Sequence, residues 1–165
     1  MKKLLITGGF GFVGRELVKL TQNIFELHVV DNLLSGEHRQ KSMDREKFTF
    51  HNIDLRNRKS TEALIKKVQP DTIIHLAAIH FIPQCETEPD LACGTNILST
   101  VNLLNSIDSS VKFIYTSSAA VYSPSNEPLV ENKSEVGPVD IYGYSKLHGE
   151  HYVNLYADRY DLDAT

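Results

Sequence analysis

A glycine-rich turn near the amino terminus constrains the fold of this sequence more than any other feature. Residues 9–14 read GFGFVG and match the pattern G-x-G-x-x-G. They stand between an apolar run from Lys3 to Thr7, which predicts a buried strand, and a stretch from Gly11 to Thr21, which predicts a helix. A strand, a glycine-rich turn and a helix in this order are typical of the first unit of a parallel α/β sheet.

Short apolar runs alternate with longer helical stretches along the rest of the chain. This order predicts a Rossmann-like α/β fold, a doubly wound parallel sheet with helices on both faces, as one domain over residues 1–165. The last residues, Asp161 to Thr165, resemble the approach to another strand, so we expect a truncated chain. The further predicted strands are Glu26–Asp31, Phe48–Ile53, Thr72–Ala77 and Val111–Ser117, the further helices are Lys59–Val68, Pro89–Ile107 and Asp140–Tyr160, and Leu34–Glu46 is predicted as a loop or an irregular helical turn.

The composition excludes several classes of protein. Apolar residues make up 41% of the 165 residues, which is enough for one sizeable core. The formal net charge is only -4 and no long run of Lys or Arg occurs, so we expect no nucleic-acid partner. No segment approaches the roughly 20 apolar residues that cross a bilayer, which predicts a cytoplasmic protein with no membrane partner. In that compartment Cys85 and Cys93 are expected to be free thiols.

The glycine-rich turn has the chemistry of an anion site. Glycine lets the backbone approach a pyrophosphate without an intervening Cβ, and the free N–H groups at a helix start favour negative charge. Gly14, one turn into the helix, would allow the helix to lie close to the strand. The alternative is an ordinary strand-to-helix turn in which the glycines only relieve backbone strain.

Two carboxylates at strand ends bear on this choice. Asp31 ends the second strand about 20 residues beyond the turn, where a carboxylate accepts hydrogen bonds from adenosine ribose hydroxyls and repels a 2′-phosphate. This favours NAD over NADP as the cofactor. The alternative for Asp31 is an Asx turn with Asn32. Asp54 follows the third strand, where it would lie near the adenine edge or cap the next helix.

A tyrosine, a lysine and a serine form a second candidate cluster. Tyr142 and Lys146 are spaced to share one face near the start of the last predicted helix. A phenol with a pKa of about 10 is a poor base at neutral pH, and a nearby ammonium lowers that pKa. Ser118 lies just past the fifth predicted strand, at the sheet edge where open α/β sheets bind ligands. Such a cluster is suited to moving a proton from an alcohol.

These motifs together resemble the extended short-chain dehydrogenases/reductases. Within them the chain looks most like the NAD-dependent epimerase/dehydratase group that acts on nucleotide sugars, particularly the UDP-glucose 4-epimerases. The similarity covers nearly the whole chain. The motifs that occur in the family order are Thr7–Gly14, Asp31–Leu33, Asp54–Arg56, His75–Ala78, Ser117–Tyr122 and Tyr142–Lys146.

The resemblance implies a reaction and a role for each site residue. Tyr142 would take a proton from a sugar hydroxyl as hydride leaves for the nicotinamide, and the hydride would return to the other face of the keto sugar. Lys146 would hold the nicotinamide ribose and tune Tyr142, and Ser118 would orient the sugar hydroxyl. Asn96 would be structural or would support the cofactor. The implied NAD-binding residues are Gly8, Gly11, Phe12, Val13, Gly14, Asp31, Asn32, Asp54, Leu55, Leu76, Ala77, Ala78, Asn96, Tyr142 and Lys146, with no metal ligand.

Departures from the family pattern narrow the function. The dehydratases usually carry an Asp-Glu pair where this chain has Ala119 and Ala120, which argues against dehydration. Ser123 stands where the family commonly has glycine. Family members are roughly twice as long, and the missing half supplies most contacts to a UDP-sugar. The alternatives to the epimerase are therefore a non-catalytic NAD-binding module or sensor and an NAD-dependent sugar-nucleotide reductase or dehydratase.

Other residues are interpreted more simply. His80, Phe81 and Cys85 follow the fourth predicted strand, where they either border the nicotinamide or serve loop packing. His148 and His151 lack a third ligand, so no metal site is expected there. An apolar stripe on the last helix is predicted to belong to the core or to a homodimer interface, because family members commonly dimerise through the two long helices. The stripe consists of Tyr152, Leu155 and Tyr156.

Overall fold

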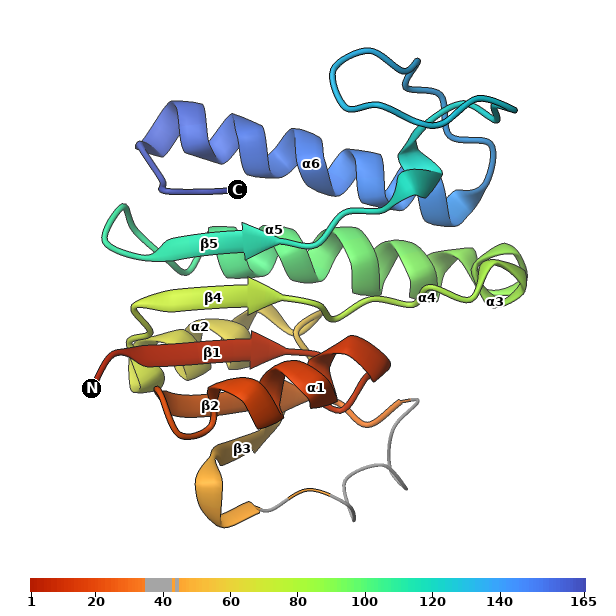
Figure 1. Ribbon diagram of the computed structural model, residues 1–165. Coiled ribbons are helices and arrows are strands. Elements are labelled where there is room, and N and C mark those ends of the chain that lie inside the picture. Colours follow the sequence, from red (N-terminus) through yellow and green to blue (C-terminus); the bar gives the residue numbers. More distant parts are fainter. Residues whose placement is uncertain (35–42, 44) are drawn as a thin grey trace.

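The computed structural model describes residues 1–34, 43 and 45–165, and its centre is a parallel sheet (Figure 1). The strand order is β3-β2-β1-β4-β5, so the chain winds outward from β1 in both directions, which confirms the Rossmann-like prediction. All neighbouring strands pair in parallel, with Leu5 opposite His28 on one side and opposite Ile73 on the other. The strands are β1 (Lys3–Thr7), β2 (Glu26–Asp31), β3 (Thr49–Asn52), β4 (Thr72–His75) and β5 (Lys112–Tyr115).

Helices cover both faces of the sheet. On one face, α1 (Phe12–Thr21) packs through Val18 against Leu4, Ile6 and Val29. On the other face, α2 (Arg58–Val68), α5 (Ser99–Leu104) and α6 (Ile141–Tyr160) enclose a larger core around Leu5 and Phe113. The side chains of each strand alternate between these two cores, which is why consecutive positions such as Leu4, Leu5 and Ile6 in β1 are all apolar and buried.

The predicted helix Pro89–Ile107 is more elaborate than the sequence indicated. It consists of α4 (Pro89–Cys93), a π-helical segment η3 (Gly94–Leu98) and α5, and it ends at Leu104 rather than Ile107. Pro89 occupies the first turn, as predicted. A short helix α3 (Ile82–Thr87), absent from the prediction, precedes it. The other helices match their predicted positions to within one residue at each end.

Three predicted strands extend further than the observed ones, and each loses residues at its carboxyl end. In the prediction Thr72–Ala77, for example, pairing stops at His75, and Leu76 and Ala77 instead donate their N–H groups to the hydroxyl of Thr7. Their backbone is thereby turned out of the sheet toward the ligand-binding edge. Most of the predicted loop Leu34–Glu46 lies outside the described residues; at its end Arg45–Lys47 forms the short helix η2.

The last residues continue the sheet pattern. Asp161 ends α6 in the left-handed conformation, with φ of 53°, and Leu162 is buried in the larger core. Phe113 N–H donates to the carbonyl of Asp163 at 2.8 Å, and Tyr115 N–H donates to that of Thr165 at 2.7 Å. Ala164 therefore lies parallel to β5, as the sequence predicted for this segment.

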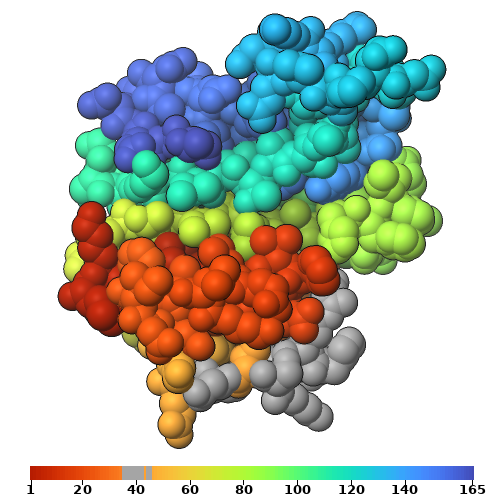
Figure 2. All heavy atoms as spheres, viewed as in Figure 1, coloured from red at the N-terminus to blue at the C-terminus, as the bar shows by residue number. Residues whose placement is uncertain are grey.

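The segment that joins β5 to α6 stands out from the molecular surface (Figure 2). It begins with a short helix η4 (Ala119–Val121) and carries four exposed aliphatic side chains. None of the described helices is both long enough and apolar enough to span a membrane. Cys85 is buried and Cys93 is exposed, and both are free thiols, as predicted. The exposed aliphatic residues are Leu129, Val130, Val136 and Val139.

Candidate active site

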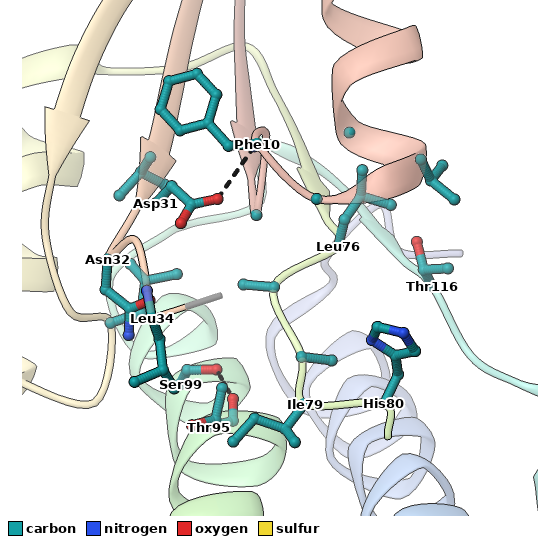
Figure 3. A pocket seen from close by; sticks show the side chains of 18 of the residues that line it. Phe10, Asp31, Asn32, Leu34, Leu76, Ile79, His80, Thr95, Ser99 and Thr116 are labelled. Atoms are coloured by element: carbon teal, nitrogen blue, oxygen red, sulfur yellow. Dashed lines mark hydrogen bonds between the residues drawn. The ribbon is translucent and has the colours of Figure 1, made fainter. Parts of the chain in front are cut away.

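A cavity of about 520 Å³ opens at the carboxyl ends of the strands. Its volume is within the range of small-molecule and cofactor sites. Its position is the one at which open α/β sheets bind ligands. Figure 3 shows Asp31 and Asn32 on one side of the cavity and His80 and Thr116 on the other. Predicted site residues on its lining are Gly8, Gly11, Phe12, Val13, Gly14, Asp31, Asn32, Asp54, Leu55, Leu76, Ala77, Ala78, Tyr142 and Lys146.

The glycine-rich turn forms one wall because side chains have no room there. Gly8 has φ of 66°, and a Cβ on it would lie 2.8 Å from the Cα of Ala77. A Cβ on Gly14 would lie 2.7 Å from the Cα of Gly9 and would also collide with the carbonyl of Gly8. Helix α1 begins directly after Gly11, and Gly11 itself lines the cavity. The wall is therefore backbone at the start of a helix, which is the geometry that binds phosphate.

Asp31 is oriented by backbone donors on two sides. Its Oδ2 accepts a hydrogen bond from Phe10 N–H at 3.1 Å, and its Oδ1 accepts one from Leu33 N–H at 2.8 Å (Figure 3 shows the first). The Asx turn weighed as an alternative is thus present, and it coexists with a position on the cavity wall. Each carboxylate oxygen retains capacity for a second donor, so the turn orients the group without saturating it.

Asp54 is bound to a neighbouring arginine. Arg56 donates to it through its backbone N–H at 3.0 Å and through the guanidinium, whose Nη2 lies 2.5 Å from Oδ2. The Arg56 guanidinium holds the pKa of the Asp54 carboxyl below its usual range. The helix-capping alternative for Asp54 is wrong, because Asn57 caps α2 by accepting from Ser60 N–H at 3.1 Å. Asp54 remains on the cavity lining beside Leu55.

The sequence analysis missed several cavity residues, among them two hydroxyl-bearing side chains on one helix. Thr95 and Ser99 lie one turn apart on the helix opposite Asn32, at the lower edge of the cavity in Figure 3. The hydroxyl of Ser99 donates to the carbonyl of Thr95. Within the described residues the buried Thr95 Oγ1 has no hydrogen-bond partner, so it is available to a ligand. Nothing in the sequence pattern distinguishes these hydroxyls from others on the helix.

Lys146 is a buried cation beside Tyr142. Only 4% of Lys146 is exposed, and its Nζ lies 4.6 Å from the ring centroid of Tyr115. Burial lowers the pKa of the Lys146 ammonium to about 8, while the Glu150 carboxylate opposes that change. Among the described residues Nζ has no hydrogen-bond acceptor, and Lys146 lines the cavity with Tyr142. Its donors are therefore available to a bound ligand.

Ser118 lies at the margin of the site. Its hydroxyl oxygen accepts from Ala120 N–H at 3.2 Å and caps η4, and the cavity is lined by the preceding Thr116 and Ser117 instead. The first turn of α6 packs closely on η4, because a Cβ on Gly143 would collide with the carbonyl of Ala120. Ser118 is thus brought to the end of α6 that carries Tyr142, but it is not on the cavity surface.

Asn96 has a structural position. Its Oδ1 accepts from Ile79 N–H at 2.8 Å, and its Nδ2 donates to the carbonyl of Ile79 and to Ser145 Oγ. Ser145 in turn donates to the carbonyl of Tyr142 at 2.7 Å. Asn96 is buried and does not line the cavity. It therefore acts on the site indirectly, by holding the loop after β4 against α6.

The remaining candidates divide between the cavity and the surface. His80 and Phe81 line the cavity, whereas Cys85 is buried and its thiol donates to the carbonyl of Ile79. His148 and His151 are exposed on α6, with ring centroids 6.3 Å apart. In the predicted stripe, Tyr156 packs on the larger core and donates to Asn105 Oδ1, while Tyr152 and Leu155 are exposed.

Comparison with known proteins gives concordant results. Residues 4–165 match the family described as NAD dependent epimerase/dehydratase. A putative UDP-glucose 4-epimerase of Methanocaldococcus jannaschii is 32% identical over 97% of this chain and 52% of its own length. This chain therefore spans about half the length of that relative.

Solved structures agree with the sequence comparison. The UDP-glucose 4-epimerase of Thermus thermophilus in complex with NAD superposes with a TM-score of 0.88 at 26% identity, covering 98% of this chain and 53% of that one. The Thermotoga maritima UDP-glucose 4-epimerase with UDP-glucose gives a TM-score of 0.86 at 29% identity, covering 97% and 52%.

Proposed function

The chain belongs to the NAD-dependent epimerase/dehydratase family, and we propose that its cavity binds NAD for the transient oxidation of a nucleotide-sugar hydroxyl, in a reaction of the UDP-glucose 4-epimerase type. The similar structures from Thermus thermophilus and Thermotoga maritima, named as complexes with NAD and with UDP-glucose, support both ligands. The chain covers about half of those proteins, so the reaction is proposed for these residues working within a protein of that length.

The cavity fits NAD at each of its parts. Gly8 and Gly14 leave bare backbone where a Cβ would collide, which suits the pyrophosphate. Asp31, which Phe10 N–H holds at the cavity wall, would accept hydrogen bonds from the adenosine ribose and would favour NAD over NADP by repelling a 2′-phosphate. Thr95 and Asp54, also on the cavity lining, would contact the adenosine half of NAD. Lys146, on the same lining, would supply ammonium donors to the nicotinamide ribose.

The protein side chains would then control the proton. NAD, when bound, supplies the hydride acceptor. Tyr142 Oη takes the proton of the sugar hydroxyl, and Lys146 makes this feasible because a nearby cation stabilises phenolate. Ser118 would orient the same hydroxyl, because its O–H donor is not used when its oxygen accepts from Ala120 N–H. Ala119 and Ala120 offer no acid or base for eliminating water, which favours epimerisation over dehydration.

The observation that carries this proposal is the buried ammonium of Lys146, which has no hydrogen-bond or ion-pair partner among the described residues and lies one helical turn from Tyr142. The test is Tyr142→Phe in the catalytically competent protein. Turnover should fall by about a thousandfold while NAD affinity stays within about threefold, since only the proton acceptor is removed. Tyr144→Phe, on an exposed neighbouring position of α6, is the matched control. Undiminished turnover in Tyr142→Phe would exclude Tyr142 as the base.

A titration separates the cofactor from the sugar nucleotide. The 165-residue chain should bind NAD and should not bind UDP-glucose in calorimetry, because we expect most sugar-nucleotide contacts to come from the half of the relatives that this chain does not cover. Binding of UDP-glucose to this chain alone would contradict that assignment. Binding of NAD by the competent protein without any turnover of sugar nucleotides would favour a non-catalytic NAD-binding module.

We also propose a cytoplasmic homodimer that associates through α4–α5 and α6. The free thiols of Cys85 and Cys93 suit a reducing compartment. A second copy would cover exposed apolar side chains on both elements, namely Leu98 in η3, between α4 and α5, and Tyr152 and Leu155 on α6. Sedimentation should give a dimer for the wild type and a monomer for Leu155→Glu. A wild-type monomer at micromolar concentration would contradict this part of the proposal.

A further inference from the structure

The ammonium of Lys146 has a mixed electrostatic environment that the proposed mechanism leaves unexplained. The titratable groups that face it are His75 on β4, Tyr115 on β5, and Tyr142 and Glu150 on α6. Burial and the Lys146 charge lower the pKa of His75 to about 3, so His75 is neutral. Burial raises the pKa of Tyr115, so its phenol is neutral as well. Glu150 is the one anionic group in this set.

Glu150 is close enough to act on Lys146 but is held by another residue. It lies one helical turn beyond Lys146 on α6, yet the two side chains form no ion pair in the described part of the chain. The Glu150 Oε1 accepts a hydrogen bond from the hydroxyl of Ser117, which lines the cavity. The Tyr115 ring occupies the adjacent space, because Gly149 provides no Cβ and a Cβ there would lie 2.5 Å from Tyr115 Cζ.

We propose that Glu150, restrained by Ser117, is a positioning residue that keeps the Lys146 ammonium charged without pairing with it. This inference rests on the proposed function of Lys146 and adds a second layer to that site. No other anionic side chain is recorded as acting on Lys146 among the described residues.

The arrangement resolves two opposing requirements on a buried lysine. Removal from water favours the neutral amine, and a neutral amine neither stabilises a phenolate nor binds ribose hydroxyls as strongly. A direct ion pair would keep the charge but would take up at least one of the three ammonium donors that a ligand could use. A carboxylate one turn away still stabilises the charge through Coulomb attraction, which falls only with the inverse of distance. The donors then remain directed into the cavity.

The decisive measurement is the titration of Lys146 in the chain without cofactor. The protein is labelled with ¹³C-lysine, and the Lys146 resonance is assigned by its loss in Lys146→Arg. Glu150→Gln keeps an acceptor for Ser117 but removes the charge, so the pKa of Lys146 should fall by about one pH unit. Glu150→Asp retains the charge and should restore most of the wild-type midpoint. Asp158→Asn, an exposed position further along α6, controls for net charge.

The outcomes separate this inference from the proposed function. A Lys146 midpoint in Glu150→Gln equal to that in wild type and in Asp158→Asn would overturn the inference, whatever happens to the melting temperature. NAD affinity of the wild-type chain is a separate readout, since its absence would contradict the proposed function and leave the Lys146 titration intact as a test.

A second variant keeps the inference testable if Glu150→Gln does not fold. In Ser117→Ala the carboxylate is released and is expected to pair with the ammonium, so the pKa of Lys146 should rise instead of falling. NAD affinity should weaken about threefold as ammonium donors are withdrawn from the cavity. An unchanged or lowered Lys146 midpoint in Ser117→Ala would contradict the restraining role of Ser117.

Discussion

Around β1 and β2 the cavity wall is backbone, whereas around β5 and α6 it is buried side chain. The first region binds through the absence of Cβ atoms at Gly8 and Gly14 and through one carboxylate, Asp31, that backbone N–H groups orient. The second depends on Lys146, Tyr142 and the groups that set their charge. Steric fit therefore governs one end of the site and electrostatics governs the other, so the two ends should respond differently to substitution, pH and salt.

The largest effect is expected where backbone fit is broken. Gly14→Ala should weaken NAD binding by at least about a hundredfold and destabilise the fold by about 3 kcal/mol, because the new Cβ meets backbone atoms that cannot move independently. Gly94→Ala is the matched control, since its Cβ would meet only the flexible Arg56 side chain at 3.3 Å. Calorimetric titration and chemical unfolding measure both effects. Equal behaviour of the two variants would mean that the turn is not a steric determinant.

The next effect concerns the buried charge. Lys146→Met should weaken NAD binding by about thirtyfold yet stabilise the cofactor-free chain below pH 8 by about 3 kcal/mol, since a desolvated ammonium is removed. The folded chain loses the Lys146 proton near pH 8, and the unfolded chain holds it up to its ordinary pKa. Wild-type stability relative to Lys146→Met should therefore rise with pH across that interval.

Unfolding curves between neutral and alkaline pH check the Lys146 prediction. Lys112→Met, on the exposed part of β5, should show no such relative rise. A wild-type chain that is more stable than Lys146→Met at neutral pH would show that the buried ammonium is paired in a way the structure does not record.

A smaller effect should follow from Asp31→Asn. The preference for NAD over NADP should fall by about tenfold, because the charge that repels a 2′-phosphate is lost while the side-chain shape is retained. Asp71→Asn, at the amino ends of the strands and away from the cavity, changes the net charge equally and should leave the preference unchanged. Competition between the two cofactors measures the ratio, and a ratio unaffected by Asp31→Asn would argue that the adenosine ribose lies elsewhere.

The smallest effect should come from the hydroxyl of Thr95, which has no hydrogen-bond partner in the described part of the chain. Thr95→Val should weaken NAD binding by about threefold and raise the stability of the cofactor-free chain by up to about 1 kcal/mol, because an unsatisfied buried hydroxyl is replaced by a methyl group. Thr100→Val should instead be destabilising, since Thr100 Oγ1 bonds both His75 and the carbonyl of Asn96. Identical stability changes in these two variants would contradict the difference in their hydrogen bonding.

The sequence predicted most of the first region and less of the second. A glycine pattern between a strand and a helix predicts a tight turn, because the backbone requirement involves only neighbouring residues. The position of Asp31 follows because it ends the second predicted strand. Tyr142 and Lys146 were placed on one helix face by spacing alone. The charge of Lys146, by contrast, depends on Tyr115, Ser117 and Glu150, which meet only when β5 and α6 pack together.

Other discrepancies have the same origin. The sequence leaves Asp54 with two roles, near the adenine edge or as the cap of α2, because it does not show that Arg56 folds back onto that carboxylate. The predicted strand that begins at Thr72 is too long because Leu76 and Ala77 are apolar. In the structure their N–H groups bond to the hydroxyl of Thr7 and not to a neighbouring strand. Short-range patterns describe which residues are apolar, and tertiary hydrogen bonds decide where pairing stops.

The π-helical segment Gly94–Leu98 constrains the number of residues in the helix that contains it. A regular helix turns by about 100° per residue, so one wide turn offsets the angular phase of the helix before it from that of the helix after it. Asn96 sits inside this segment and fixes the loop at Ile79, while Thr100 beyond it meets His75 on the sheet. Removing a single residue between these two contacts would turn one of them away from its partner. The residue count of this helix is therefore as constrained as the identity of Asn96.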